Sequence, residues 1–137
     1  MSLANQQSSI GALGGKHDAD HLYNPNKSNI STAAMDLWLR SPMTNDVKVP
    51  GLGDASSTAL RNAGIHGVFP LLAKYLEFSG TGTTPVDAAQ RFFDWLGSIP
   101  GFPTTGACKH SITRSIAERL QVVFPELGYN AAVYPKR

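Results

Sequence analysis

The 137-residue sequence lacks the features that define several large classes of protein. It holds a single cysteine, Cys108, so no disulfide can form within the chain, and we expect an intracellular protein. No window approaches the roughly 18 apolar residues of a membrane-spanning helix, and the first residues lack the pattern of a signal peptide. Charged residues make up only 16% of the chain and the formal net charge is +2. This weak excess permits binding to nucleic acid without requiring it.

Helical patterns are what the sequence does contain. Apolar residues recur at helical spacing, and no stretch alternates with the period of two that is typical of strands. We expect helices over about residues 32–40, 54–63, 68–78, 85–96 and 109–123, with N-caps at Ser31 or Thr32, Asp54 and Thr84 and a C-terminal stop at Gly64. The expected core residues are Leu37, Trp38, Leu60, Phe69, Leu72, Tyr75 or Leu76, Val86, Ala89, Phe92, Phe93, Leu96, Ile112, Ile116, Leu120 and Val123. The fold class predicted is all-α, a compact five-helix bundle.

Composition divides the chain into three parts. Residues 1–30 are rich in Ser, Asn, Gly and Gln, which favours a flexible or loosely docked arm, and residues 128–137 form a C-terminal tail. Residues 31–127 form the folded domain. Within the arm, His17 and His21 stand four residues apart, the spacing of a metal pair on a helix. Glycines before them and Asn24-Pro25 after them disfavour a helix, so we expect a solvated polar segment and no metal site.

The stretch VPGLGDASSTALRNAG, residues 49–64, is the motif that suggests a chemistry. Gly51 and Gly53 stand directly before a helix of small residues, and glycine allows the backbone to approach another group closely. The N–H groups at a helix start point outward, and the helix dipole adds a partial positive charge. We therefore interpret the turn as a cradle for a DNA phosphate, which would bind DNA regardless of its sequence.

The same pattern also suits a purely structural turn. Gly-x-Gly before a helix is common, and Asp54 would then only cap the helix at one corner of the bundle. The Asp54 carboxylate also stands close to the expected phosphate position. The motif alone leaves both interpretations open.

Four segments in order along the chain favour the first interpretation: VPGLGDASSTALRNAGI, FPLLAKYLEF, RFFDWLGS and GACKHSITRSIAERL. Together they resemble the barrier-to-autointegration factor (BAF) family over about residues 32–127. That family has a glycine-rich hairpin turn and helix, then a leucine-rich helix ending in an aromatic-Leu pair like Tyr75-Leu76. A Phe-x-x-Trp-Leu helix like residues 92–96 follows, and then a Gly-Ala turn with a lysine opening the last helix. The tripeptide at 41–43, SPM, has a similar counterpart after the family's first helix.

The resemblance implies a SAM-like domain with a helix-hairpin-helix motif that forms a two-fold homodimer. Each subunit would bind one DNA duplex without sequence preference, so that the dimer bridges or compacts DNA. A non-enzymatic protein of the nucleus or of chromatin is implied, with no cofactor, and the dimer groove could take another protein. The DNA-contacting residues expected on this sequence are Gly51, Leu52, Gly53, Ala55, Arg61, Ala107, Lys109 and Arg114.

The sequence departs from the family pattern at its cations. Residues 32–34 contain no counterpart of the family's N-terminal lysine, and a lysine of the hairpin helix falls near Ala59, with Arg61 close by. Fewer phosphate-neutralising cations should give weaker binding and a shallower dependence on salt.

Catalysis is the class of function that the residues favour least. Cys108, Lys109 and His110 place a thiol beside a base, but a cysteine nucleophile needs a spatially positioned histidine and an orienting partner, and no partner is identifiable. We predict no catalytic residue and no metal ligand. Two alternatives to the DNA-bridging dimer stay open: a helical protein-interaction module with a structural hairpin, and an accessory DNA-binding domain of a DNA-processing complex.

Overall fold

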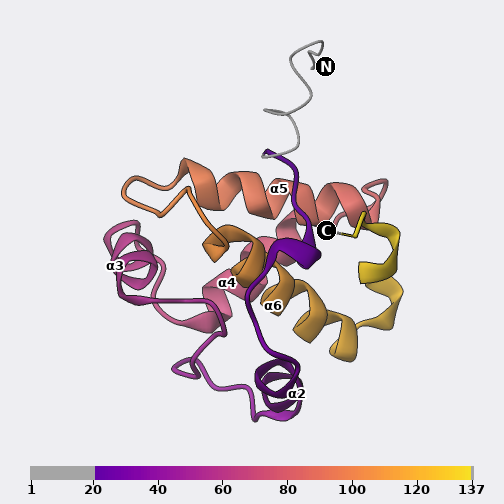
Figure 1. The fold of residues 1–137 in the computed structure, drawn as a ribbon, viewed down its shortest axis with the longest axis horizontal. Coiled ribbons are helices and arrows are strands. Elements are labelled where there is room, and N and C mark those ends of the chain that lie inside the picture. The colour runs from indigo at the N-terminus through magenta and orange to yellow at the C-terminus, as the bar shows by residue number, and fades with distance from the viewer. Residues whose placement is uncertain (1–20, 137) are drawn as a thin grey trace.

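The structure is a computed structural model and describes residues 21–136. In this range every regular element is helical, as the sequence predicts, and Figure 1 shows their arrangement. The α-helices are α2 (Thr32–Arg40), α3 (Asp54–Asn62), α4 (Val68–Phe78), α5 (Pro85–Ser98) and α6 (Cys108–Val123). Three 3-10 helices complete the described part: η1 (Pro25–Lys27), η2 (Pro125–Leu127) and η3 (Ala131–Val133).

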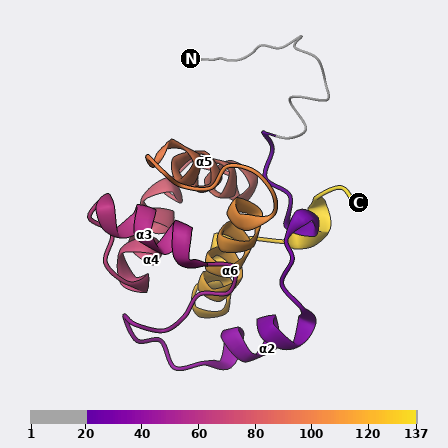
Figure 2. The same cartoon turned by 60° about the vertical axis from the view of Figure 1, so that its left-hand side comes forward.

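Helix α6 lies at the centre, where it contacts α5, α4 and α2 and the 3-10 helices η1 and η2 (Figure 2). Its predicted apolar row is buried at Ile112, Ile116 and Leu120, none of them more than 4% exposed. The row ends there, because Val123 in the last position of the helix is 55% exposed, and its placement in the core was wrong.

Local signals fix the helix starts. The Ser31 hydroxyl accepts a hydrogen bond from the Ala34 N–H at 3.1 Å, and the Thr84 hydroxyl accepts one from the Asp87 N–H at 3.1 Å, as expected of N-caps. The predicted cap at Asp54 is wrong, because Asp54 is already the first helical residue and Gly53 is the N-cap.

The end of α3 follows the prediction at Gly64. This glycine has a φ of +87°, and the helix ends two residues before it at Asn62. The Gly64 N–H donates to the Arg61 carbonyl at 3.0 Å and the Ile65 N–H to the Leu60 carbonyl at 2.9 Å. These bonds form a Schellman motif, which satisfies carbonyls that the helix leaves without partners.

Three predicted core residues lie on the surface instead. Leu37 on α2, Phe69 on α4 and Val86 on α5 are 64%, 50% and 46% exposed. Helix α2 turns the face with Met35 and Trp38 toward α6, and the Trp38 indole N–H donates to the Ser115 carbonyl at 2.9 Å. Helix α4 likewise buries a face shifted by one residue from the expected one, made of Val68, Leu71 and Tyr75.

Both ends of the described chain contribute to the core. Tyr23 lies in the part assigned to a flexible arm and is 3% exposed, and its hydroxyl lies 2.7 Å from that of Tyr129 in the expected tail. Tyr134 packs edge-on against Tyr23, and burial raises its pKa to about 12. Close packing therefore extends beyond residues 31–127 on both sides. His17 lies outside the described residues.

Candidate functional site

The hairpin segment 49–52 forms a tight turn ahead of α3. The Leu52 N–H donates to the Val49 carbonyl at 3.1 Å, and Gly51 between them has a φ of +93°. A proline in the second position and a glycine with positive φ in the third are the signature of a type II turn. Val49 is 1% exposed, so its side chain anchors the turn in the core.

Helix α6 holds this turn through three contacts. The Ser115 hydroxyl donates to the Pro50 carbonyl at 3.0 Å, and the Cys108 thiol lies 3.7 Å from the Gly51 carbonyl oxygen. A Cβ placed on Gly51 would lie only 2.5 Å from the Cβ of Ser111. Gly51 is therefore required by its own φ and by packing against α6, whereas the sequence suggested the close approach of a phosphate.

Gly53 differs from Gly51 in both respects. Its φ is −99°, and a Cβ at this position would meet nothing within 4 Å. Its N–H is already used, because it donates to the Ser56 hydroxyl at 3.0 Å, and that hydroxyl returns a bond to the Gly53 carbonyl at 3.1 Å. The N–H groups of Leu52 and Gly53, expected to face a phosphate, are thus both bonded within the turn. Those of Asp54 and Ala55 have no acceptor in the described part of the chain.

The start of α6 lies directly beside this turn. Ala107 is the N-cap of α6 and makes no side-chain cap, and the N–H groups of Cys108 and Lys109 have no acceptor among residues 21–136. The Cys108 thiol contact to Gly51 joins the two places. The N-terminus of α6 at Cys108 therefore lies beside the turn that leads into α3 at Asp54. The dipoles of both helices place partial positive charge on this edge of the molecule.

The three predicted cations are not equally placed for this edge. Lys109 belongs to it but is half-buried, with its Nζ 4.2 Å from the centre of the Phe93 ring. Arg114 is engaged inside the protein, where its guanidinium bonds Glu118 at 2.8 Å and the Ser28 hydroxyl at 3.0 Å. Arg114 therefore ties η1 to α6 and is not displayed for a ligand.

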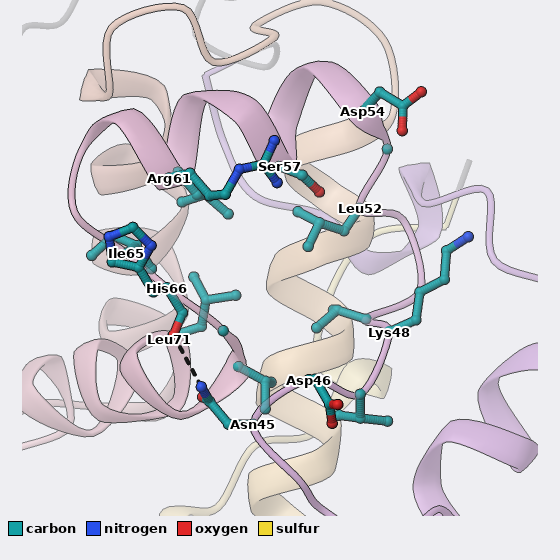
Figure 3. A pocket seen from close by; sticks show the side chains of 16 residues that line it. Asn45, Asp46, Lys48, Leu52, Asp54, Ser57, Arg61, Ile65, His66 and Leu71 are labelled. Atoms are coloured by element: carbon teal, nitrogen blue, oxygen red, sulfur yellow. Dashed lines mark hydrogen bonds between the residues drawn. The ribbon is translucent and has the colours of Figure 1, made fainter.

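Arg61 lies away from the α6 edge, over a cleft of about 560 Å³ that α3 forms with residues 45–49 and the start of α4. Figure 3 shows its side chain running along this cleft beside Ser57, while Lys48 extends away from it. Asn45 closes one end of the cleft: its side-chain amide donates to the His66 carbonyl at 3.2 Å, and its Oδ1 accepts from the Phe69 N–H at 3.0 Å.

The residues that hold the hairpin turn in place carry no local signal of that role in the sequence. They are buried serines: the hydroxyls of Ser115 and Ser111 bond backbone groups far away in the sequence, and that of Ser56 bonds Gly53 three residues before it. Ser115, Ser111 and Ser56 are each at most 1% exposed. Serines on otherwise apolar helix faces could have indicated these contacts, because a buried hydroxyl needs a hydrogen-bond partner.

Other chemistry has little support in the described residues. Burial raises the pKa of the Cys108 thiol, the opposite of what a reactive cysteine requires. Residues 21–136 contain no cluster of three or more His, Cys, Asp and Glu side chains suited to a metal ion. No helix in the same range is long and apolar enough to cross a membrane.

Comparison of the chain with protein-family models, curated proteins and solved structures gives no match.

Proposed function

We propose that this protein binds double-stranded DNA through its phosphates, without sequence preference and without catalysis. The supporting observation is the meeting of two helix N-termini, at Asp54 and Cys108, held together by the contacts of Gly51 with α6. Free N–H groups and helix dipoles at one edge form a surface suited to an anion. Contacts of this kind carry no base information.

The donors in this proposal are backbone groups. The N–H groups of Asp54 and Ala55 on α3 and of Cys108 and Lys109 on α6 are available. The Lys109 ammonium belongs to a residue of this edge but lies over the Phe93 ring. Gly53 supplies the open space above the turn, since a Cβ there would meet nothing within 4 Å. A backbone-based site with few cations fits a protein whose net charge is only +2.

A homodimer completes the proposal, because two such edges would bridge two duplexes. Exposed apolar side chains gather where α4 approaches the end of α6: Leu76 is 38% and Phe124 46% exposed, and both line one hollow of about 550 Å³. Exposed apolar surface of this kind is typical of a contact between proteins. We assign it to a second copy, and light scattering of Leu76→Glu against the wild type tests this with loss of the dimer as the expected result.

Fluorescence anisotropy with two unrelated duplexes at low and moderate salt tests the DNA proposal. The wild type should bind both duplexes equally and more weakly as salt rises. Gly53→Glu places a carboxylate in the open space of the site without straining the backbone, and should reduce affinity at least tenfold. Ala132→Glu makes the same charge change at an exposed position of η3 and should bind as the wild type does.

Absence of binding by the folded wild type at low salt would contradict the proposal. The hairpin would then be a structural turn, and the Leu76–Phe124 surface would favour the second candidate, a protein-interaction module. Binding without bridging, seen as a single duplex per particle, would instead favour an accessory DNA-binding domain of a larger complex.

A further inference from the structure

The side chain of Lys109 lies folded back across α5 rather than extended from the edge. Its Nζ is 4.2 Å from the centre of the Phe93 ring, within the distance at which a cation is attracted to an aromatic face. Phe93 is only 1% exposed, so core packing fixes the ring and the ammonium has a rigid aromatic face to bind.

Gly97 makes room for this position. A Cβ on residue 97 would lie 3.2 Å from the Lys109 Nζ, 3.6 Å from its Cδ and 3.9 Å from its Cε. Gly97 lies inside α5 and does not have a positive φ, so its backbone conformation does not call for glycine. Glycine in a helix interior lowers helix stability relative to alanine. The Lys109 side chain occupies the space that a side chain at residue 97 would need, and this explains why residue 97 is a glycine.

Asp94 adds an electrostatic attraction on the same face of α5. Its carboxylate accepts a hydrogen bond from the Gln90 amide at 2.9 Å, which holds it in place. Desolvation raises the pKa of Asp94, and the hydrogen bond from Gln90 and the positive charge of Lys109 oppose that rise. Asp94, Phe93, Gly97 and Lys109 line one hollow of about 890 Å³. The ammonium therefore has attractive partners on α5 and open space in which to leave them.

We propose that Lys109 has two positions: it rests over Phe93 and Gly97 in the free protein and extends to a phosphate when DNA binds. Gly97 is then a positioning residue, since the space it leaves determines how firmly Lys109 is held back. The inference rests on the proposed DNA binding. It predicts that filling the space at residue 97 releases the lysine and strengthens binding.

Gly97→Ala and Gly97→Leu test the proposal as a graded pair. The alanine methyl group displaces the Lys109 ammonium by a few tenths of an ångström, and the leucine side chain occupies the position of the ammonium over Phe93. Both residues favour helix, so α5 should be retained. The loss of one cation–π contact from the free state should tighten DNA binding by about two- to fivefold, more for leucine than for alanine. Gly80→Ala is the control: a Cβ on residue 80 would meet nothing within 4 Å, in contrast to residue 97, and neither glycine has a positive φ.

Nuclear magnetic resonance supplies a readout that does not depend on DNA. The Lys109 ε-CH₂ protons should be shifted upfield by the Phe93 ring in the wild type and should lose that shift in the two Gly97 variants. In a Lys109→Ala background, Gly97→Leu should leave affinity unchanged. This separates release of the lysine from any direct effect of leucine on DNA.

The outcomes distinguish the two-position proposal for Lys109 from the proposed DNA binding on which it rests. If the wild type binds DNA but the ε-CH₂ shift is normal, or the Gly97 variants do not bind more tightly, the two-position proposal is wrong and DNA binding stands. If the upfield shift is present but the wild type binds no DNA at low salt, the proposed function fails and the release step fails with it.

Discussion

Two turns of this protein share a sequence pattern and a conformation but not their surroundings. Val49-Pro50-Gly51-Leu52 and Ile99-Pro100-Gly101-Phe102 both read apolar, proline, glycine, apolar. In each, the fourth N–H donates to the first carbonyl, at 3.1 Å and 3.0 Å, and the glycine has a φ of +93° or +80°. The local pattern therefore specifies the same type II turn twice.

The two turns differ in what lies against them. Gly51 is pressed against Ser111 of α6, and α3 begins three residues later at Asp54. A Cβ placed on Gly101 would lie at an ordinary 4.0 Å from the Ala59 side chain, and α6 begins only at Cys108. Tertiary packing thus makes the first turn part of a rigid edge with two helix N-termini. The second is a connection of the same shape without that role.

Alanine at each glycine should separate conformation from packing. Gly101→Ala introduces backbone strain alone, with an expected loss of about 1 kcal/mol in the free energy of unfolding. Gly51→Ala adds a clash with Ser111 and should lose about 3 kcal/mol. Urea denaturation measures both variants, and equal losses would mean that packing against α6 does not distinguish the turns.

Removing the hydroxyl that holds the first turn should have the next largest effect. Ser115 is fully buried and donates to the Pro50 carbonyl, so Ser115→Ala leaves a buried acceptor without its donor and should cost about 2 kcal/mol. Ser98→Ala is the control, because its exposed hydroxyl donates to the Trp95 carbonyl in the same manner. Amide exchange at Leu52 should accelerate only in Ser115→Ala. Unchanged exchange there would show that the hydroxyl does not hold the turn.

The part of the fold that could be predicted from the sequence is the part with local causes. Helices 32–40 and 68–78 have the bounds that the sequence predicts. Of the first cap predicted at Ser31 or Thr32, the structure has Ser31, and the cap predicted at Thr84 is confirmed. The buried face of a helix depends on its neighbours, and for this reason the exposed positions of Leu37 and Phe69 were missed.

The candidate site could be predicted only in part for the same physical reason. The turn and the start of α6 were both identified, but the requirement for Gly51 comes from Ser111, which lies 60 positions later in the sequence. Which N–H groups remain available also depends on a local bond, the one between the Gly53 N–H and the Ser56 hydroxyl, which the expected cap at Asp54 did not include. Interactions between segments far apart in sequence leave no periodic signal.

The N-termini of α3 and α6 also differ in charge, and this difference gives a test of the proposed DNA binding. Helix α3 begins with Asp54, whereas α6 has no acidic residue in its first turn. Asp54→Asn should tighten DNA binding about fivefold at low salt, since it removes a negative charge from beside the phosphate. Asp87→Asn makes the same change in the first turn of α5 and should alter only helix stability, by under about 1 kcal/mol. Equal affinities of the two variants would place the phosphate away from α3.

The smallest effect is expected at the second glycine of the hairpin motif, Gly53. Gly53 has an ordinary φ and open space where a Cβ would be, so neither strain nor packing opposes alanine. Alanine is a poorer N-cap than glycine, but it also reduces the entropy of the unfolded chain, and these two effects offset each other. Gly53→Ala should therefore change the free energy of unfolding by less than about 0.5 kcal/mol. A loss of unfolding free energy as large as that of Gly51→Ala would mean that the turn itself requires both glycines. The glycine at position 53 would then be explained without a ligand.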